Sequence, residues 1–171
     1  MSPAADRSTR APLTPLQAIV GGALVVGVLD LLDALLFFGA RGVPPVPILH
    51  SIASGLLGRA AFRGGAATAA LGVLLHFVIA LGVVAVYYAA SRAMPRLRRQ
   101  PLLYGPLYGL VVYAVMNVIV VPLSAAPDGP KPWPVLVNGL LIHMLGVGLP
   151  AALAARAAGP PSEPRARMAP A

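Results

Sequence analysis

The chain has no cysteine among its 171 residues and few charged residues of any kind. The absence of cysteine excludes disulfides, thiolate metal sites, cysteine nucleophiles, lipobox acylation and c-type haem attachment. Charged residues make up 11% of the sequence, whereas a soluble domain carries about 25%. Hydrophobic residues make up 58%, and the mean hydropathy is +0.81. This composition takes the chain out of the soluble class, and its length allows one domain.

Acidic residues are the scarcest group: five stand against 13 lysines and arginines, which gives a net charge of +8. The arginines lie at the ends of apolar runs, where they set orientation and meet anionic lipid headgroups. The lipid bilayer and those headgroups are therefore the expected partners. No basic and aromatic surface remains outside the runs, so the charge does not indicate nucleic-acid binding. Abundant alanine, and arginine far in excess of lysine, are typical of a GC-rich bacterial genome.

Four apolar runs are long enough to cross a bilayer, which takes about 20 residues of helix. We predict spans over residues 16–40, 66–90, 102–123 and 135–155. Thr14, Pro15 and Gln17 form a capping-box pattern at the start of the first span. A cleaved signal peptide is the competing interpretation, but this run exceeds the apolar core of about 7–15 residues that such a peptide has. It also contains Asp30 and Asp33, so we predict a retained span.

Residues 48–62 predict a short helix that does not span the membrane. A proline-rich turn from Arg41 to Pro47 precedes it, and Gly64-Gly65 ends it. Its apolar residues and its polar or small residues each recur every three to four positions, which predicts opposite faces. At about 15 residues it is too short to cross, so we expect an interfacial or re-entrant helix. Pro150 predicts a kink in the last span.

The basic residues predict the orientation. Nine lie in the two tails and the second loop, and four lie in the first and third loops. The positive-inside rule then places both termini in the cytoplasm. Residues 1–13 and 158–171 are predicted to be disordered cytoplasmic tails. The sequence thus predicts an all-α integral membrane bundle over residues 14–157, in a bacterial inner (plasma) membrane. The bundle has four transmembrane helices plus one short amphipathic or re-entrant helix.

Six aspartate, histidine and asparagine residues lie inside the predicted spans, where each needs a partner or a path to water. They are Asp30, Asp33, His76, Asn117, Asn138 and His143. At a rise of about 1.5 Å per residue, all six fall in the outer half of the bundle. Asp30 and Asp33 are three residues apart, which predicts that they share one helix face. His50 and Ser51 on the short helix are the possible cover of this cluster.

Two interpretations of the cluster rest on its polar groups alone. In the first, the six residues only join the helices, at about 0.6 kcal/mol for each hydrogen bond. In the second, the two carboxylates and nearby histidines form a proton or ion site, because such groups titrate near physiological pH when desolvated and paired. Spacing does not decide which side chains face inward, so both interpretations stay open.

A cofactor is the third interpretation. A divalent metal would take ligands from His76, His143, Asp30 and Asp33, and haem b would lie between the two histidines. Small residues near His143 would make room for a macrocycle or would serve close helix packing: Gly139, Gly146 and Gly148. No ligand motif such as HExxH is present, so no cofactor is predicted.

The expected function is an accessory or structural membrane protein. The alternative is a proton- or ion-coupled carrier or channel component, and the second alternative is a metal- or haem-binding membrane protein. The sequence has no P-loop, dinucleotide-binding fingerprint or nucleophile elbow, so it favours a protein that is not an enzyme. A homo-oligomer would suit a carrier, since four helices alone seldom enclose a wide path.

Several short features recur in one known layout. They are Pro44-Pro45 after the first span, His76 with Ala80 and Gly82 in the second, Pro122-Leu123 at the exit of the third, and His143 in the fourth. In this layout the chain resembles, over about residues 15–157, a group of uncharacterised bacterial inner-membrane proteins of the YagU type. The resemblance implies a small multispanning inner-membrane protein and brings no reaction with it.

Overall fold

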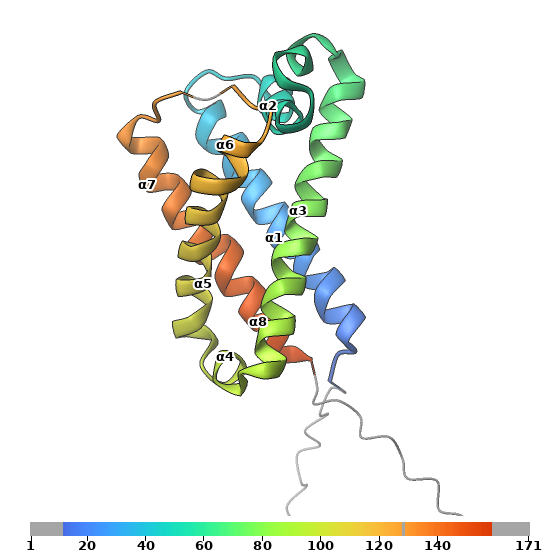
Figure 1. Ribbon diagram of the computed structural model, residues 1–171, viewed down its shortest axis with the longest axis vertical. Coiled ribbons are helices and arrows are strands. Elements are labelled where there is room, and N and C mark those ends of the chain that lie inside the picture. The colour runs from blue at the N-terminus through green and yellow to red at the C-terminus, as the bar shows by residue number, and fades with distance from the viewer. Residues whose placement is uncertain (1–11, 128, 159–171) are drawn as a thin grey trace, which may run out of the picture.

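The computed structural model describes residues 12–127 and 129–158, which form a helical bundle (Figure 1). Most of both predicted tails lies outside the described residues. Where the tails begin, the backbone N–H of Leu13 donates to the carbonyl of Ala157 at 3.1 Å. Leu13 and Ala158 form an isolated bridge, and no strand forms within the described ranges.

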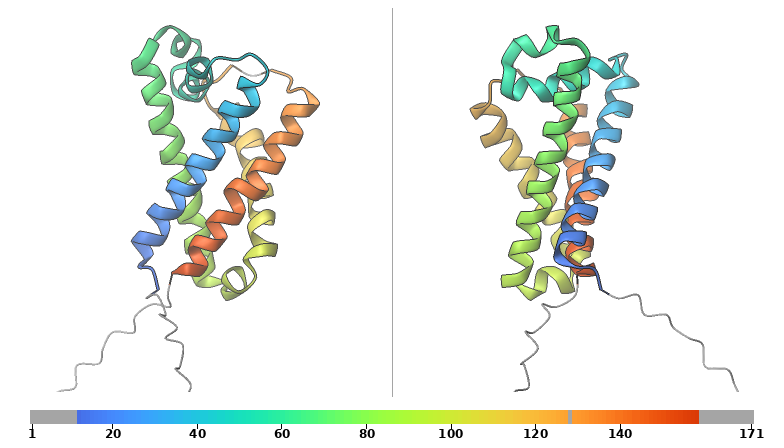
Figure 2. Two further views of the ribbon diagram at one scale, coloured as in Figure 1. Left: turned by 180° about the vertical axis from the view of Figure 1, so that it is seen from behind. Right: turned by 90° about the vertical axis from the view of Figure 1, so that its right-hand side faces the viewer.

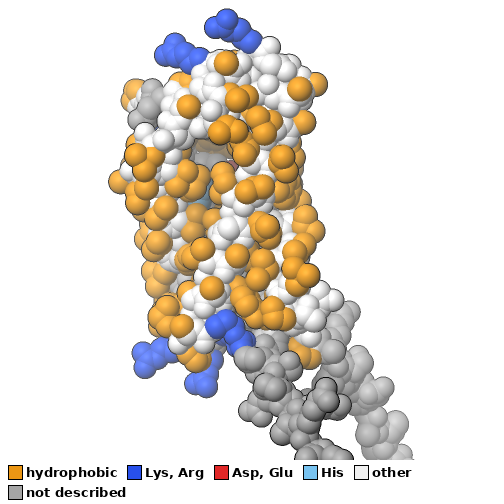
Figure 3. Space-filling view, turned by 45° about the vertical axis from the view of Figure 1, so that its right-hand side comes forward, with side chains coloured by type: hydrophobic (Ala, Val, Ile, Leu, Met, Phe, Trp, Pro, Cys, Tyr) orange, Lys and Arg blue, Asp and Glu red, His pale blue; other side chains and the backbone are white. Residues whose placement is uncertain are grey.

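Four continuous helical stretches are long and apolar enough to cross a membrane, which confirms the predicted fold class. They are α1 (Pro15–Gly39); α3 (Gly65–Ala93); α5 (Pro101–Val115) continued by η2 (Met116–Val120) and α6 (Val121–Leu123); and α7 (Trp133–Ile142) continued by η3 (His143–Gly148) and α8 (Leu149–Ala157). Large apolar side chains cover their outer surfaces, as Leu102 and Val118 show at 75% and 73% exposure. This apolar band lies between arginines at the two ends (Figure 3) and suits contact with lipid.

Local sequence explains where the first helix begins. The backbone N–H of Gln17 donates to Thr14 Oγ1 at 3.2 Å, and the N–H of Thr14 donates to Gln17 Oε1 at 3.0 Å. This reciprocal pair is the predicted capping box, with Pro15 in the first turn. It satisfies two donors that a helix start otherwise leaves free.

The short helix α2 (Pro45–Leu57) starts earlier than expected and gives way to a 3-10 turn, η1 (Gly58–Arg63). The prediction of a turn through Pro47 is wrong, because proline is well tolerated in the first turn of a helix. Gly58 ends the helix with a φ of 59°, a conformation that favours glycine. The predicted separation of faces is also incomplete, since His50 and Ser54 are buried together with Ile48.

The bundle has two distinct ends (Figures 1 and 2). The cap end is covered by α2 and η1, and the terminal end is where α1 begins and α8 finishes. At the terminal end the short helix α4 (Pro95–Arg99) joins α3 to α5, and these two helices diverge toward the cap end (Figure 1). A core rich in alanine and valine, together with Tyr87, packs between α1, α3, α5 and α8.

Two spans contain a wide π-helical segment just before a proline. The segment η2 precedes Pro122, and η3 precedes Pro150, where a kink is predicted. Proline lacks an N–H and its ring clashes with the carbonyl four residues earlier, so a normal turn is disfavoured there. A π-helical turn accommodates this misfit within a continuous helix, and such turns are frequent at functional sites.

Candidate functional site

A cavity of about 360 Å³ lies beneath the short helix, near the cap end. Side chains of α1, α2, α3, α5, η2 and η3 line it, and a hollow is visible on this part of the surface (Figure 3). Most of the lining is apolar. The polar side chains that reach it are Asp30, Ser51, His76, Asn117, Ser124 and His143.

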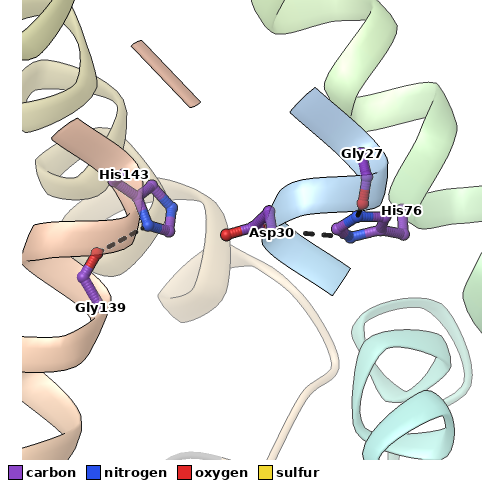
Figure 4. Close-up of polar contacts among 5 residues, drawn as sticks. All are labelled: Gly27, Asp30, His76, Gly139 and His143. Carbon is purple, nitrogen blue, oxygen red and sulfur yellow. Dashed lines mark hydrogen bonds and ion pairs between the residues drawn. The ribbon is translucent and has the colours of Figure 1, made fainter. Parts of the chain in front are cut away.

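Asp30 is the central group of this site. Its carboxylate, carried by α1, lies between His76 of α3 and His143 of η3 (Figure 4). Asp30 Oδ2 is 4.0 Å from His76 Nδ1, and the side chains are 26% and 12% exposed, respectively. Among the described residues no group donates a hydrogen bond to this carboxylate. It does interact electrostatically with both histidines and with Asp33.

His76 is oriented by the backbone of α1. Its Nε2 donates to the carbonyl of Gly27 at 2.8 Å, one turn before Asp30. Glycine at position 27 lets α3 come this close to α1. A side chain there would collide with the ring of Phe77, which lies 2.5 Å from the position of an ideal Cβ. Since a carbonyl only accepts, Nε2 carries a proton and Nδ1 is the nitrogen left to gain one.

His143 is oriented by its own helix. Its Nδ1 donates to the carbonyl of Gly139 at 2.8 Å, and the Tyr113 ring lies edge-on at 5.3 Å between ring centroids. Gly109 of α5 packs directly on this turn, because a Cβ there would strike the His143 carbonyl. Because His143 Nδ1 carries the proton that it donates to Gly139, Nε2 is the nitrogen that can take a second one. Each histidine thus has one N–H that donates to a carbonyl and one nitrogen that can take a proton.

Asp33 and Asn138 form a separate pair outside the cavity lining. Asn138 Nδ2 donates to Asp33 Oδ2 at 2.7 Å, which joins α1 to α7. Three residues along a helix correspond to a rotation of about 300°, so the two aspartates point about 60° apart. That rotation sends Asp30 to the histidines and Asp33 to the amide. Arg41 is directed to its own helix, where its Nη1 donates to the Phe37 carbonyl at 2.7 Å.

Asn117 and the possible cover residues occupy the upper part of the site. Asn117 lines the cavity, donates from Nδ2 to the Tyr113 carbonyl at 2.8 Å, and accepts a hydrogen bond from Lys131 Nζ. Ser51 also lines the cavity, as expected of a cover residue. His50 lies elsewhere: it is 5% exposed, and its Nε2 donates to the Gly65 carbonyl at 2.8 Å.

The side chains named as possible cofactor ligands are arranged as follows. Within the described ranges, no three histidine or acidic side chains are grouped closely enough to hold a metal ion. Haem ligation from opposite sides would need open space between the two histidines, where Asp30 lies (Figure 4). The nearby glycines serve packing: Gly148 lies against the backbone of α5, and a Cβ on Gly139 would be 2.8 Å from the Tyr113 ring.

Sequence reasoning missed the part of the cavity that the segment after the third span supplies. Ser124 lines the cavity, and the backbone N–H of Ala125 donates to the Gly55 carbonyl of α2 at 2.9 Å. This bond ties the α6–α7 loop to the short helix on the cap side of the cavity. The one sequence feature close to this contact is Pro122, which marks the end of the third span.

Fold and site together define a four-span helical membrane protein with a mostly apolar cavity near its cap end, into which an aspartate and two histidines reach. Comparisons of the chain with known protein families, curated proteins and solved structures find no match, so the resemblance to the YagU type stays a prediction.

Proposed function

We propose that this protein is a proton-linked carrier, or a component of one, in which Asp30, His76 and His143 exchange a proton when a small solute or ion occupies the cavity. The observation that carries this proposal is the Asp30 carboxylate, which lies between two histidines and receives no hydrogen bond from the described residues. Ionisable groups inside membrane spans are costly, and they mark proton and substrate paths.

The other polar residues have partners that account for their presence. Asp33 and Asn138 bond to each other, Asn117 bonds to Tyr113 and Lys131, and each histidine donates to a carbonyl. Such bonds join membrane helices, as an accessory or structural protein requires. Asp30 accepts no such hydrogen bond from the described residues, and its contact across helices is the 4.0 Å approach to His76 Nδ1, an ion pair only when the histidine holds a second proton.

The three groups form a unit that holds or releases a proton. A proton on His76 Nδ1, on His143 Nε2 or on the Asp30 carboxyl offsets the negative charge, and its loss restores that charge. A cation that enters the cavity would displace this proton to water, so one positive charge replaces another. Asp33, bound to Asn138, is the nearest further acid, and α2 contributes only the Ser51 hydroxyl and apolar groups to the lining.

Two tyrosines join α3 to α5 on the terminal side of the cavity. Tyr108 Oη donates to the Val83 carbonyl at 2.7 Å, and the rings of Tyr87 and Tyr108 meet with centroids 4.9 Å apart. A carrier would have to separate α3 from α5 at this contact in order to open toward the terminal end. The proposed setting is a bacterial inner membrane, with the terminal end cytoplasmic and with the chain acting as a monomer or a homo-oligomer.

Proteoliposomes with a pH-sensitive dye inside test the proposal. After an acid pulse, protein-dependent proton movement is expected in the presence of a suitable cation, and candidates such as Na⁺, K⁺ and small amines are screened in turn. Asp30→Asn should abolish the movement. Asp33→Asn, one turn away and outside the cavity, should leave most of it. Equal loss in both variants, or no proton movement with any cation, favours the accessory or structural role instead.

A further inference from the structure

A second hollow, of about 470 Å³, lies at the terminal end, far from the cavity of Asp30. Its lining consists of Pro95, Arg98 and Arg99 of α4, and Arg156 in the last turn of α8. Three arginines from two helices that are distant in the sequence therefore line one hollow. The arginines at this end also stand out in the space-filling view (Figure 3).

The short helix α4 holds its arginines in fixed positions. Pro95 starts the helix, and the buried Tyr87 hydroxyl donates to the Leu97 carbonyl at 3.0 Å. Leu97 packs on the core, so the helix cannot turn freely. Arg98 Nη2 also donates to the Ala158 carbonyl at 3.4 Å, which draws α4 toward the end of α8.

No described acid offsets these charges. The two acidic residues in the described ranges, Asp30 and Asp33, both lie in the half of α1 near the cap end. Arginines in a last helical turn also complement the helix dipole, but that effect needs only proximity to their own helix end. It does not require three of them to share one hollow.

We propose that Arg98, Arg99 and Arg156 form a binding site for a phosphate group at the terminal end of the bundle. Guanidinium groups present paired donors that match phosphate oxygens, and several together suit a group of more than one negative charge. Basic pockets at helix ends in the headgroup layer bind anionic lipid headgroups. A soluble phosphate compound has the same chemistry, so the experiment must distinguish the two sources.

The test uses the purified full-length chain in detergent. Native mass spectrometry measures retention of phosphatidylglycerol and, as the neutral comparison, phosphatidylcholine. Pyrophosphate is titrated separately, as the soluble probe. Preferred retention of phosphatidylglycerol supports a lipid site, whereas pyrophosphate binding without lipid preference supports a soluble ligand. Binding of neither probe overturns the proposal.

Two control variants, Arg96→Gln and Arg63→Gln, distinguish a formed site from general surface charge. Arg98→Gln, Arg99→Gln and Arg156→Gln should each weaken binding about fivefold, the equivalent of about 1 kcal/mol per arginine. Arg96→Gln removes the same charge from the same short helix but lies outside the hollow, and Arg63→Gln removes it at the cap end. Both should change binding less than about twofold. Equal losses in Arg96→Gln and Arg98→Gln would overturn the proposal, and gel filtration of each variant verifies folding.

Discussion

His76 Nδ1 faces Asp30 Oδ2 at 4.0 Å, while the opposite nitrogen of the same ring is held by the Gly27 carbonyl at 2.8 Å. Gly27 and Asp30 are three residues apart on α1, so one turn of a helix both orients the imidazole and presents a carboxylate to it. The hydrogen bond from Nε2 to the Gly27 carbonyl leaves Nδ1 as the nitrogen that can gain a proton. This relationship is the basis of the proposed proton site, with His143 on the other side of Asp30 (Figure 4).

The Asp33–Asn138 bond should contribute to stability without affecting proton exchange. Removing either partner should lower the free energy of unfolding, and a double-mutant cycle should give a coupling of about 0.6–1.7 kcal/mol. The measurement is reversible unfolding in mixed micelles for Asp33→Leu, Asn138→Leu and the double variant, because leucine removes the hydrogen-bonding group on either side. A coupling near zero would mean that the 2.7 Å contact does not stabilise the bundle.

Gly109 should be intolerant of any side chain. An alanine Cβ would strike the His143 carbonyl of η3, so α5 would have to move, at a cost of about 1–3 kcal/mol. Gly21→Ala is the control, since nothing lies within 4 Å of its Cβ position. That substitution should be neutral or should stabilise by up to about 1 kcal/mol through helix propensity. Thermal unfolding in detergent compares the two, and equal stability would contradict the close α5–η3 contact.

The fold follows from sequence more fully than the site does. Apolar runs and the Thr14–Gln17 pattern predict the spans, because span length and helix caps are local properties. The π-helical segments depend on how Pro122 and Pro150 fit against neighbouring helices, and periodicity carries no information on that. Likewise, depth places six polar residues in one half of the bundle, but it cannot separate Asp30 from Asp33. Helix rotation in the packed bundle makes that division.

The cavity should admit water to Val112 but not to its neighbour. The chain has no cysteine, so Val112→Cys and Val111→Cys each introduce the single thiol of their variant. Val112 lines the cavity, whereas Val111 is 55% exposed on the outer, lipid-facing surface. A thiol reacts as its thiolate, which forms in water and not in hydrocarbon. A small charged thiol reagent should therefore modify Val112→Cys at least about tenfold faster, and a reversed order would contradict a water-accessible cavity.

The proposed orientation places the cap end outside. Arg59 in η1 and Gln100 beside α4 are both exposed and lie at opposite ends of the bundle. An impermeant maleimide should label Arg59→Cys in intact cells, and it should label Gln100→Cys only after the membrane is permeabilised. Positive-inside predicts this result from the arginine-rich second loop. Labelling of Gln100→Cys alone in intact cells would reverse the orientation.

The most direct test of the central claim is an infrared pH titration of the protonated carboxyl band. The account predicts a carboxyl component that is lost in Asp30→Asn and kept in Asp33→Asn, and whose midpoint moves in His76→Gln and His143→Gln. Such a result would show that Asp30 holds a proton in common with the two histidines. A spectrum that Asp30→Asn leaves unchanged at every pH would contradict the account.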